Sequence, residues 1–263
     1  MDELTKEINS STRDVNRVAS LFGELVQQAV DSVNSDFGPR RLAKASRVQE
    51  PLPIDTRLLS SFRTRIGTML EYALSTAIDA LMRVKYGDSY SLTFAVAHEY
   101  PDFYLRGKQL NKLLRVEMKA VDAESDEQAA KFETATLDIE KDNDLLLLIG
   151  WTWKPIDETD PKSGEFPFIF TSVVLPAAAI AEERDIRLAL TGGKLDGKLV
   201  LVPSRKAKGT MVRDPKNYGK LWRLVHRSRH GGENASPAAL LFLGFLQEIQ
   251  NHAPRKRLKK KKD

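Results

Sequence analysis

The chain of 263 residues contains no cysteine. Disulfide bonds and zinc sites built on thiolates are therefore excluded, and the composition fits a reducing compartment. The sequence also lacks any apolar run close to the ~20 residues that a membrane-spanning helix needs. Its first residues, MDELTKEINSST, are acidic and polar, unlike a signal peptide. Walker loops, GxSxG elbows and internal repeats are missing as well. We expect a cytoplasmic protein that has no membrane partner.

Positive charge is concentrated in two segments. Residues 204–230 contain nine Lys and Arg against one acid, and residues 254–263 contain seven against one. Together these segments carry a charge of +14. Because the formal net charge of the chain is +5, the remaining residues carry −9. A basic stripe on an otherwise acidic protein indicates a polyanionic partner, with double-stranded DNA first among the candidates. The alternative is a solvated charged face, which explains this local imbalance less well.

Candidate DNA contacts lie in the first of these segments. Arginine can donate bidentately to guanine in the major groove and asparagine to adenine, whereas lysine more often contacts phosphate, which positions the protein without reading sequence. We therefore expect residues 204–230 to be a DNA-reading segment, and residues 254–263 to be a disordered tail that adds non-specific attraction. The candidate contacts are Arg205, Lys206, Lys208, Arg213, Lys216, Asn217, Lys220 and Arg223.

The most informative stretch is YPDFYLRGKQLNKLLRVEMKAV, residues 100–121. Two strands separated by a glycine-containing turn are predicted in it, over residues 103–106 and 113–121. Alternation gives the second strand an apolar face and a charged face, the latter with Arg115, Glu117 and Lys119. A carboxylate and an ammonium group side by side in a strand indicate a functional role, because burying charges is costly unless they are paired or bind a metal.

This stretch resembles the PD-(D/E)xK nuclease superfamily. Asp102 matches the aspartate after the proline, Glu117 the second acid and Lys119 the lysine. The resemblance implies that Asp102 and Glu117 hold Mg²⁺, and that Lys119 orients or deprotonates the attacking water and stabilises charge on the phosphate. In many members a helix before the first core strand adds an acid to the metal site. Glu71 matches that acid by context only, and an ordinary glutamate on a helix surface is the alternative.

Three other D-x-K strings provide an internal comparison. Residues 160–162, 196–198 and 214–216 also read Asp-x-Lys, but each contains a Pro or Gly and therefore predicts a turn. Only the string that begins at Glu117 lies in a strand pattern one hairpin after a Pro-Asp pair. The alternative to a nuclease site is a surface hairpin on which Glu117 and Lys119 face solvent.

The remaining pattern predicts an α/β fold, with a mixed central sheet flanked by helices (a restriction-endonuclease-like core) and helical additions at the N- and C-termini. The apolar run at residues 145–149 is typical of a strand covered on both faces. A helix separates it from the Glu117 strand, so we expect these two strands to be parallel. Helices are predicted over 11–34, 55–85 and 123–137, between the strand at 168–175 and about residue 187, and from residue 237 onward. Further strands are predicted over 90–97, 143–153, 168–175 and 198–202.

This order of elements matches the superfamily, and it divides the chain into three parts. Residues 1–54 form an N-terminal helix and basic linker, residues 55–253 the nuclease domain, and residues 254–263 the tail. The chain looks most like a type II restriction endonuclease: a Mg²⁺-dependent, sequence-specific endonuclease that hydrolyses double-stranded DNA, commonly as a homodimer. Two alternatives stay open, a structure-specific repair or recombination nuclease of the same superfamily and a non-catalytic nucleic-acid-binding protein.

Overall fold

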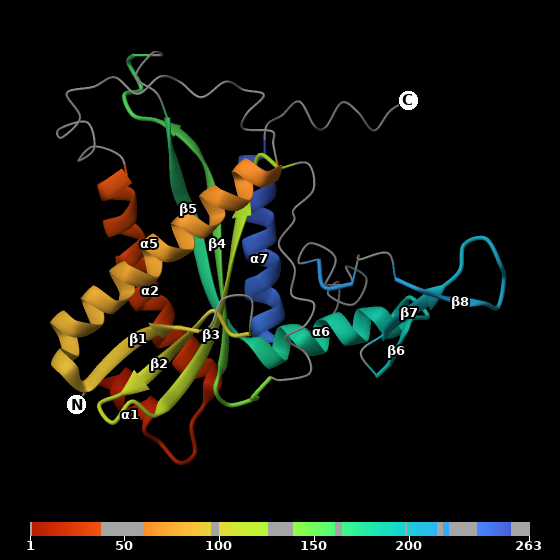
Figure 1. Ribbon diagram of the computed structural model, residues 1–263, viewed down its shortest axis with the longest axis horizontal. Helices are drawn as coiled ribbons and strands as arrows, with labels where there is room; N and C mark the ends of the chain where they lie inside the picture. The colour runs from red at the N-terminus through yellow and green to blue at the C-terminus, as the bar shows by residue number, and fades with distance from the viewer. Residues whose placement is uncertain are drawn as a thin grey trace.

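A five-stranded sheet with the strand order β1-β2-β3-β4-β5 forms the centre of the molecule (Figure 1). The computed structural model describes residues 2–37, 60–95, 100–125, 139–160, 165–197, 199–214, 218–220 and 236–253. Strands β3 and β4 are parallel, as expected, and the other neighbours are antiparallel. The predicted α/β class with a mixed central sheet is confirmed. The strands are β1 Tyr90–Phe94, β2 Phe103–Gly107, β3 Lys112–Asp122, β4 Asp144–Pro155 and β5 Glu165–Pro176.

Strand β4 is the centre of the core because helices cover both faces of the sheet here. Leu145, Leu147 and Ile149 belong to one hydrophobic core, and Leu146 and Leu148 belong to the other. All five side chains are fully buried. Burial on both faces is the physical reason why this strand is a continuous apolar run without alternation.

Three helices pack on the first face and two on the second. Leu4 and Ile8 of the short helix α1, Glu3–Ile8, join the same core as α2 and α5. Helix α2 packs on β5, and α5 packs on β1 and β3. On the second face, α6 and α7 pack on β4 and β5. The long helices are α2 Val15–Phe37, α5 Ser60–Tyr86, α6 Ala177–Leu190 and α7 Pro237–His252.

Local chemistry explains where these helices lie. The apolar stripe predicted for the first long helix is the buried side of α2, from Val18 to Val33. Helix α7 begins as predicted, because the Ser236 side chain accepts a hydrogen bond from the Ala239 amide and Pro237 occupies the first turn. None of the helices within the described ranges combines the length and hydropathy of a membrane span.

Several predicted boundaries differ from the structure. The gap between the predicted strands at 143–153 and 168–175 is shorter than expected, because β4 continues to Pro155 and β5 already begins at Glu165. Residues 123–125 form a turn after β3 where a helix was predicted to start, and the rest of that helix lies outside the described residues. The basic linker before residue 55 and the tail at 254–263 lie mostly or wholly outside them too. Helix α1 was not predicted.

A small second sheet, here called the wing, follows α6. It consists of β6 Lys194–Asp196, β7 Leu199–Pro203 and β8 Met211–Arg213, all antiparallel. Only the middle strand was predicted from sequence. In Figure 1 the wing projects from the far end of α6, away from the central sheet.

Candidate active site

The predicted site residues meet at one edge of β3. The pairing of strand β2 with β3 stops at the residue pair Phe103 and Val116. Beyond that point, two carboxylates take the place of a strand. Asp102 Oδ2 accepts a hydrogen bond from the Met118 amide at 2.7 Å, and Glu71 Oε1 accepts one from the Ala120 amide at 3.1 Å. The edge amides of β3 are thereby satisfied by the acids of the candidate site.

Helix α5 brings Glu71 to this edge. The helix packs on β3, and two turns before Glu71 its Arg63 forms an ion pair with Asp122, the last residue of β3, at 3.2 Å. Both members of this pair are largely buried. Because α5 is tied to β3 at Ala120 and again at Asp122, Glu71 is held in the site and does not face solvent as an ordinary surface glutamate would.

Lys119 connects the two other acids. Its Nζ lies 2.5 Å from Glu117 Oε1 and 3.6 Å from Asp102 Oδ2, and it donates a hydrogen bond to the Met118 carbonyl at 3.0 Å. The Glu117 side chain is 12% exposed and that of Asp102 is 38% exposed, so solvent reaches the group from the Asp102 side. The structure thus brings together Asp102, Glu117, Lys119 and Glu71.

Burial and charge change the titration of this group. Burial lowers the pKa of Lys119, but the negative charges of Glu117 and Asp102 raise it by more, so the net pKa lies above the ordinary value. Burial raises the pKa of Glu117, and the Lys119 charge opposes that rise. Burial also raises the pKa of Glu71, to about 7. Lys119 is therefore a cation at neutral pH, while Glu71 titrates near neutrality.

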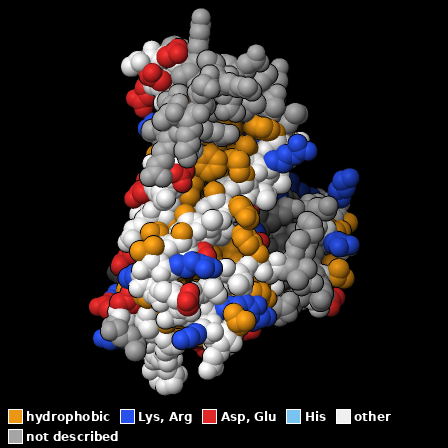
Figure 2. Space-filling model, turned by 60° about the vertical axis from the view of Figure 1, so that its left-hand side comes forward, with side chains coloured by type: hydrophobic (Ala, Val, Ile, Leu, Met, Phe, Trp, Pro, Cys, Tyr) orange, Lys and Arg blue, Asp and Glu red, His pale blue; other side chains and the backbone are white. Residues whose placement is uncertain are grey.

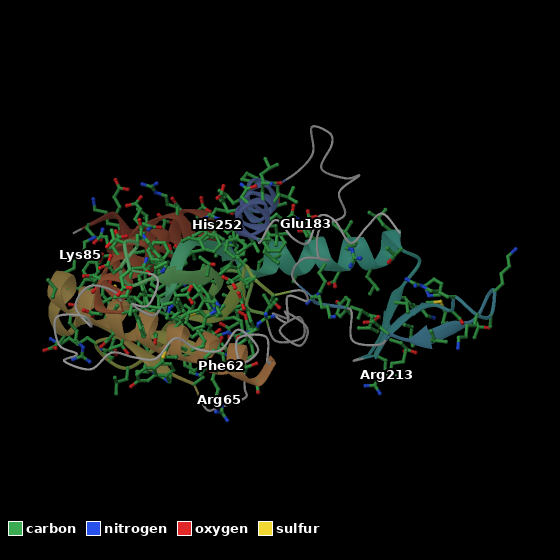
Figure 3. The ribbon with its side chains drawn as sticks, turned by 90° about the horizontal axis from the view of Figure 1, so that it is seen from above. Phe62, Arg65, Lys85, Glu183, Arg213 and His252 are labelled. Carbon is green, nitrogen blue, oxygen red and sulfur yellow. The ribbon has the colours of Figure 1, made fainter. Side chains whose placement is uncertain are left out.

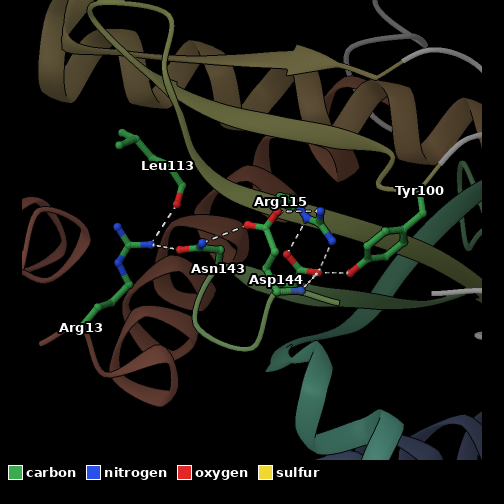
Figure 4. Close-up of polar contacts among 7 residues, drawn as sticks. Arg13, Tyr100, Leu113, Arg115, Asn143 and Asp144 are labelled. Carbon is green, nitrogen blue, oxygen red and sulfur yellow. Dashed lines mark hydrogen bonds and ion pairs between the residues drawn. The ribbon is translucent and has the colours of Figure 1, made fainter. Parts of the chain in front are cut away.

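A buried hydrogen-bond network supports the chain just before Asp102 (Figure 4). Asp144, at the start of β4, is fully buried and accepts two hydrogen bonds from Arg115, both at 2.7 Å, and one from the Tyr100 hydroxyl at 2.6 Å. Glu140 accepts a further bond from Arg115 at 2.9 Å. The network ties Tyr100, two residues before Asp102, to the first residue of β4.

Sequence reasoning placed Arg115 on the charged face but missed its partners. Burial raises the pKa of Tyr100, and its hydrogen bond to Asp144 raises it further. The only signal in the sequence is an aspartate directly before a long apolar run, which indicates a carboxylate carried into the core. Arg13, on the turn before α2, extends the network through hydrogen bonds to Asn143 and to the Leu113 carbonyl.

An exposed aromatic pair is formed by Tyr72 and Phe94, which are neighbours of site residues along the chain or across the sheet. Tyr72 follows Glu71, and Phe94 pairs across the sheet with Phe103, which follows Asp102. The rings of Tyr72 and Phe94 stack with centroids 5.3 Å apart, and both side chains are exposed. Figure 2 shows one face of the molecule on which apolar side chains gather among scattered Lys and Arg. Further planar groups can stack on exposed rings of this kind.

The wing carries most of the predicted DNA contacts that are described. Arg205, Lys206 and Lys208 are exposed in the loop between β7 and β8, and Arg213 is exposed at the end of β8. Lys220 is half-buried, and Lys216, Asn217 and Arg223 lie outside the described residues. Arg213 lies in the wing, at the opposite end of the molecule from Lys85 (Figure 3). The structure does not bring Arg205, Lys206, Lys208 or Arg213 next to the acids of the candidate site.

Tyr218 has a structural role at the base of the wing. In the sequence it lies among basic residues. Its side chain is nevertheless buried, its hydroxyl donates a hydrogen bond to Asp185, and the Arg184 guanidinium lies 4.8 Å from its ring centroid. The segment after β8 is thereby attached to α6.

The donor set of the site fits a hard divalent cation. Asp102 and Glu117 present carboxylate oxygens beside the same ammonium group, and Mg²⁺ is held in proteins by one or two carboxylates together with water. Among the described residues no group of three or more Asp, Glu, His or Cys is close enough to form a full set of protein ligands. A Mg²⁺ ion held by two carboxylates and water does not require such a group.

Comparison with protein-family models and with curated proteins finds no match for this chain.

Proposed function

We propose that this protein is a Mg²⁺-dependent endonuclease that hydrolyses phosphodiester bonds in double-stranded DNA, in the manner of type II restriction enzymes. The observation that carries the proposal is the convergence of Asp102, Glu117 and Lys119 at the point where β2 leaves β3. On a surface hairpin whose charges face solvent, Lys119 would not need to contact both carboxylates at once. Glu71 adds a third carboxylate from α5.

The proposed roles follow from the chemistry of each group. Asp102 and Glu117 would hold the Mg²⁺ ion, which when bound lowers the pKa of water and neutralises charge on phosphoryl oxygens. Lys119, as a cation, orients the attacking water and stabilises the negative charge that develops on the phosphate. In the reaction the water oxygen forms a bond to phosphorus, one P–O ester bond breaks, and the leaving oxygen takes up a proton.

Double-stranded DNA is the proposed substrate because exposed arginines and lysines extend over the wing, away from the acids. Arg205, Lys206, Lys208 and Arg213 would contact the duplex outside the cleavage site. A homodimer is part of the proposal, since two copies would place two sites on a palindromic duplex. A cytoplasmic location is also proposed, in line with a chain that has no cysteine.

Digestion of supercoiled plasmid and of branched DNA, each with Mg²⁺ and with EDTA, tests this function. Discrete fragments that appear only with Mg²⁺ support sequence-specific cleavage. Smearing, or cutting confined to branched substrates, would instead favour a structure-specific nuclease of repair or recombination. Binding with no cleavage of any DNA would show a non-catalytic binding protein and would overturn the proposed activity.

A further inference from the structure

The hairpin of β2 and β3 carries a second group of charges that the proposed chemistry does not use. Arg106 and Lys112 are partners in the strand register. They lie around the Tyr104 ring, with the Arg106 guanidinium carbon 5.1 Å and Lys112 Nζ 4.1 Å from the ring centroid. Lys108 is exposed in the turn between the strands. These residues are called the hairpin cation group below.

The positive charge of this group is not compensated within the described part of the chain. No described carboxylate forms an ion pair with Arg106, Lys108 or Lys112. This contrasts with Arg115 and Lys119 on the same hairpin, each of which contacts two carboxylates. Like charges gathered on one surface repel each other, so an anion bound between them would be favoured.

The orientation of the Arg106 side chain is already set. The Arg106 side chain donates hydrogen bonds to Thr93 Oγ1 and to the Leu110 carbonyl, both at 2.8 Å. The faces of the Tyr104 ring attract both cations through its quadrupole. A guanidinium that is held in one direction loses less conformational entropy when it binds a phosphate than a freely moving one.

The hairpin cation group lies on the same face of the sheet as the acids. Asp102, Tyr104 and Arg106 alternate along an extended segment, and Tyr104 pairs with Arg115, which alternates with Glu117. At about 3.3 Å per residue, Arg106 lies roughly 13 Å along the strand from Asp102. One strand of B-DNA has one phosphate for about every 3.4 Å of helix axis, so this separation is about four nucleotides.

We propose that Arg106 and Lys112, oriented around Tyr104, bind the phosphate backbone of the DNA about four nucleotides from the bond that is cleaved. The identity of the polyanion rests on the proposed function. Contacts of this kind position the DNA strand over Asp102 and Glu117 and read no bases. They are separate from the wing, and they assign DNA binding to the hairpin that also carries the acids.

The test compares charge-neutralising variants with a matched control. Lys112→Gln and the double variant Arg106→Gln/Lys112→Gln remove charge from the group. Lys6→Gln removes one exposed charge from α1, which packs on the opposite face of the sheet. The affinity for a 20–30 base-pair duplex is measured across a salt series with Ca²⁺ in place of Mg²⁺, and single-turnover cleavage is measured with Mg²⁺ at saturating DNA. Thermal melting of each variant checks that it is folded.

Each neutralised contact is expected to lower affinity roughly eightfold at 0.1 M salt and to reduce the salt slope by about one. The cleavage rate at saturating DNA should stay within about twofold of that of the wild type, and Lys6→Gln should change neither quantity. If the wild type cleaves DNA and folded Lys112→Gln and double variants bind it with unchanged affinity and slope, the hairpin cation group has no such role, while the nuclease proposal stands. A wild type that neither binds nor cleaves DNA overturns the nuclease proposal itself, and the proposed ligand of the hairpin cation group with it.

Discussion

The edge of β3 and the wing both concentrate charged side chains, and they are built in opposite ways. At the edge of β3, acids and a lysine from separate elements contact one another and are mostly buried. On the wing, Arg205, Lys206, Lys208 and Arg213 share one sign of charge and are exposed. The first arrangement can position atoms for chemistry, whereas the second can attract an extended polyanion.

This difference shows what kind of sequence signal each region leaves. A site of mixed charges depends on the exact strand register, because a shift by one residue would turn Glu117 and Lys119 to the other face. A basic surface depends mainly on the local sum of charge, and it tolerates changes of individual positions. The two regions should therefore respond to substitution in different ways.

The largest effect is expected from removing a carboxylate of the site. Asp102→Ala and Glu117→Ala should each lower the cleavage rate by at least about 10³-fold, because the remaining ligand holds Mg²⁺ poorly. DNA binding should persist or tighten, since a negative charge near the backbone is lost. Single-turnover cleavage and binding in Ca²⁺ measure the two quantities. Asp196→Ala is the control, because Asp196 begins another D-x-K string, in the wing. Near-normal cleavage by either site variant would remove that residue from the metal site.

Lys119→Ala is expected to have the next largest effect. The cleavage rate should fall by about 10²–10³-fold, because the group that orients water and stabilises charge is lost. Metal affinity should be retained, since Asp102 and Glu117 remain and no longer pair with an ammonium group. Titration of the rate with Mg²⁺ separates the two quantities. A rate that recovers at high Mg²⁺ would show that Lys119 acts on metal binding and not on the reaction.

Asp144→Ala should lower the free energy of unfolding, although it alters no residue of the wing. The substitution leaves the largely buried Arg115 guanidinium without its Asp144 partner, and breaking a buried ion pair costs about 3–5 kcal/mol. Urea unfolding measures this loss. Glu158→Ala, which breaks the exposed pair with Lys154, is the control and should change stability by less than about 1 kcal/mol. Equal effects of the two substitutions would show that the network around Asp144 carries little stability.

Glu71→Gln should change how stability depends on pH. The pKa of Glu71 is raised in the folded state to about 7 from 4.5, so the folded protein binds more protons than the unfolded chain between these values. Wild-type stability should therefore fall as pH rises from about 4.5 to 7, by on the order of 2–3 kcal/mol. Glutamine removes this dependence and can still accept the Ala120 hydrogen bond. Urea unfolding of both proteins at pH 5 and pH 8, in EDTA, measures the difference. Parallel pH profiles would contradict the raised pKa.

The smallest effects are expected on the wing, where they test whether bases are read. Arg213→Ala should weaken binding to the cognate site by about 1–3 kcal/mol and binding to random DNA only slightly. Lys208→Ala should weaken both equally and reduce the salt slope by about one. Binding of each variant to specific and random duplexes in Ca²⁺ makes the comparison. Parallel losses for both variants would show that the wing holds only the phosphate backbone.

The hairpin and its charged face could be predicted from sequence because they depend on neighbours along the chain. Alternation over residues 113–121 correctly separated Leu114, Val116 and Met118, which are buried, from Glu117 and Lys119. The apolar run at 145–149 correctly predicted a strand covered on both faces. The partners of Arg115 were missed, because Tyr100 and Asp144 are 15 and 29 residues away and no periodicity links them.

By itself, the sequence determined which residue types face the same side of each strand and each helix, because those periods are properties of the backbone. It also determined the excess of positive charge at residues 204–230. Only the tertiary structure decided that the pairing of β2 with β3 stops at Phe103 and Val116, so that the amides of Met118 and Ala120 are left for Asp102 and Glu71. That geometry depends on how α5 packs against β3, and such packing is set by shape and burial across the whole core, which no local pattern encodes.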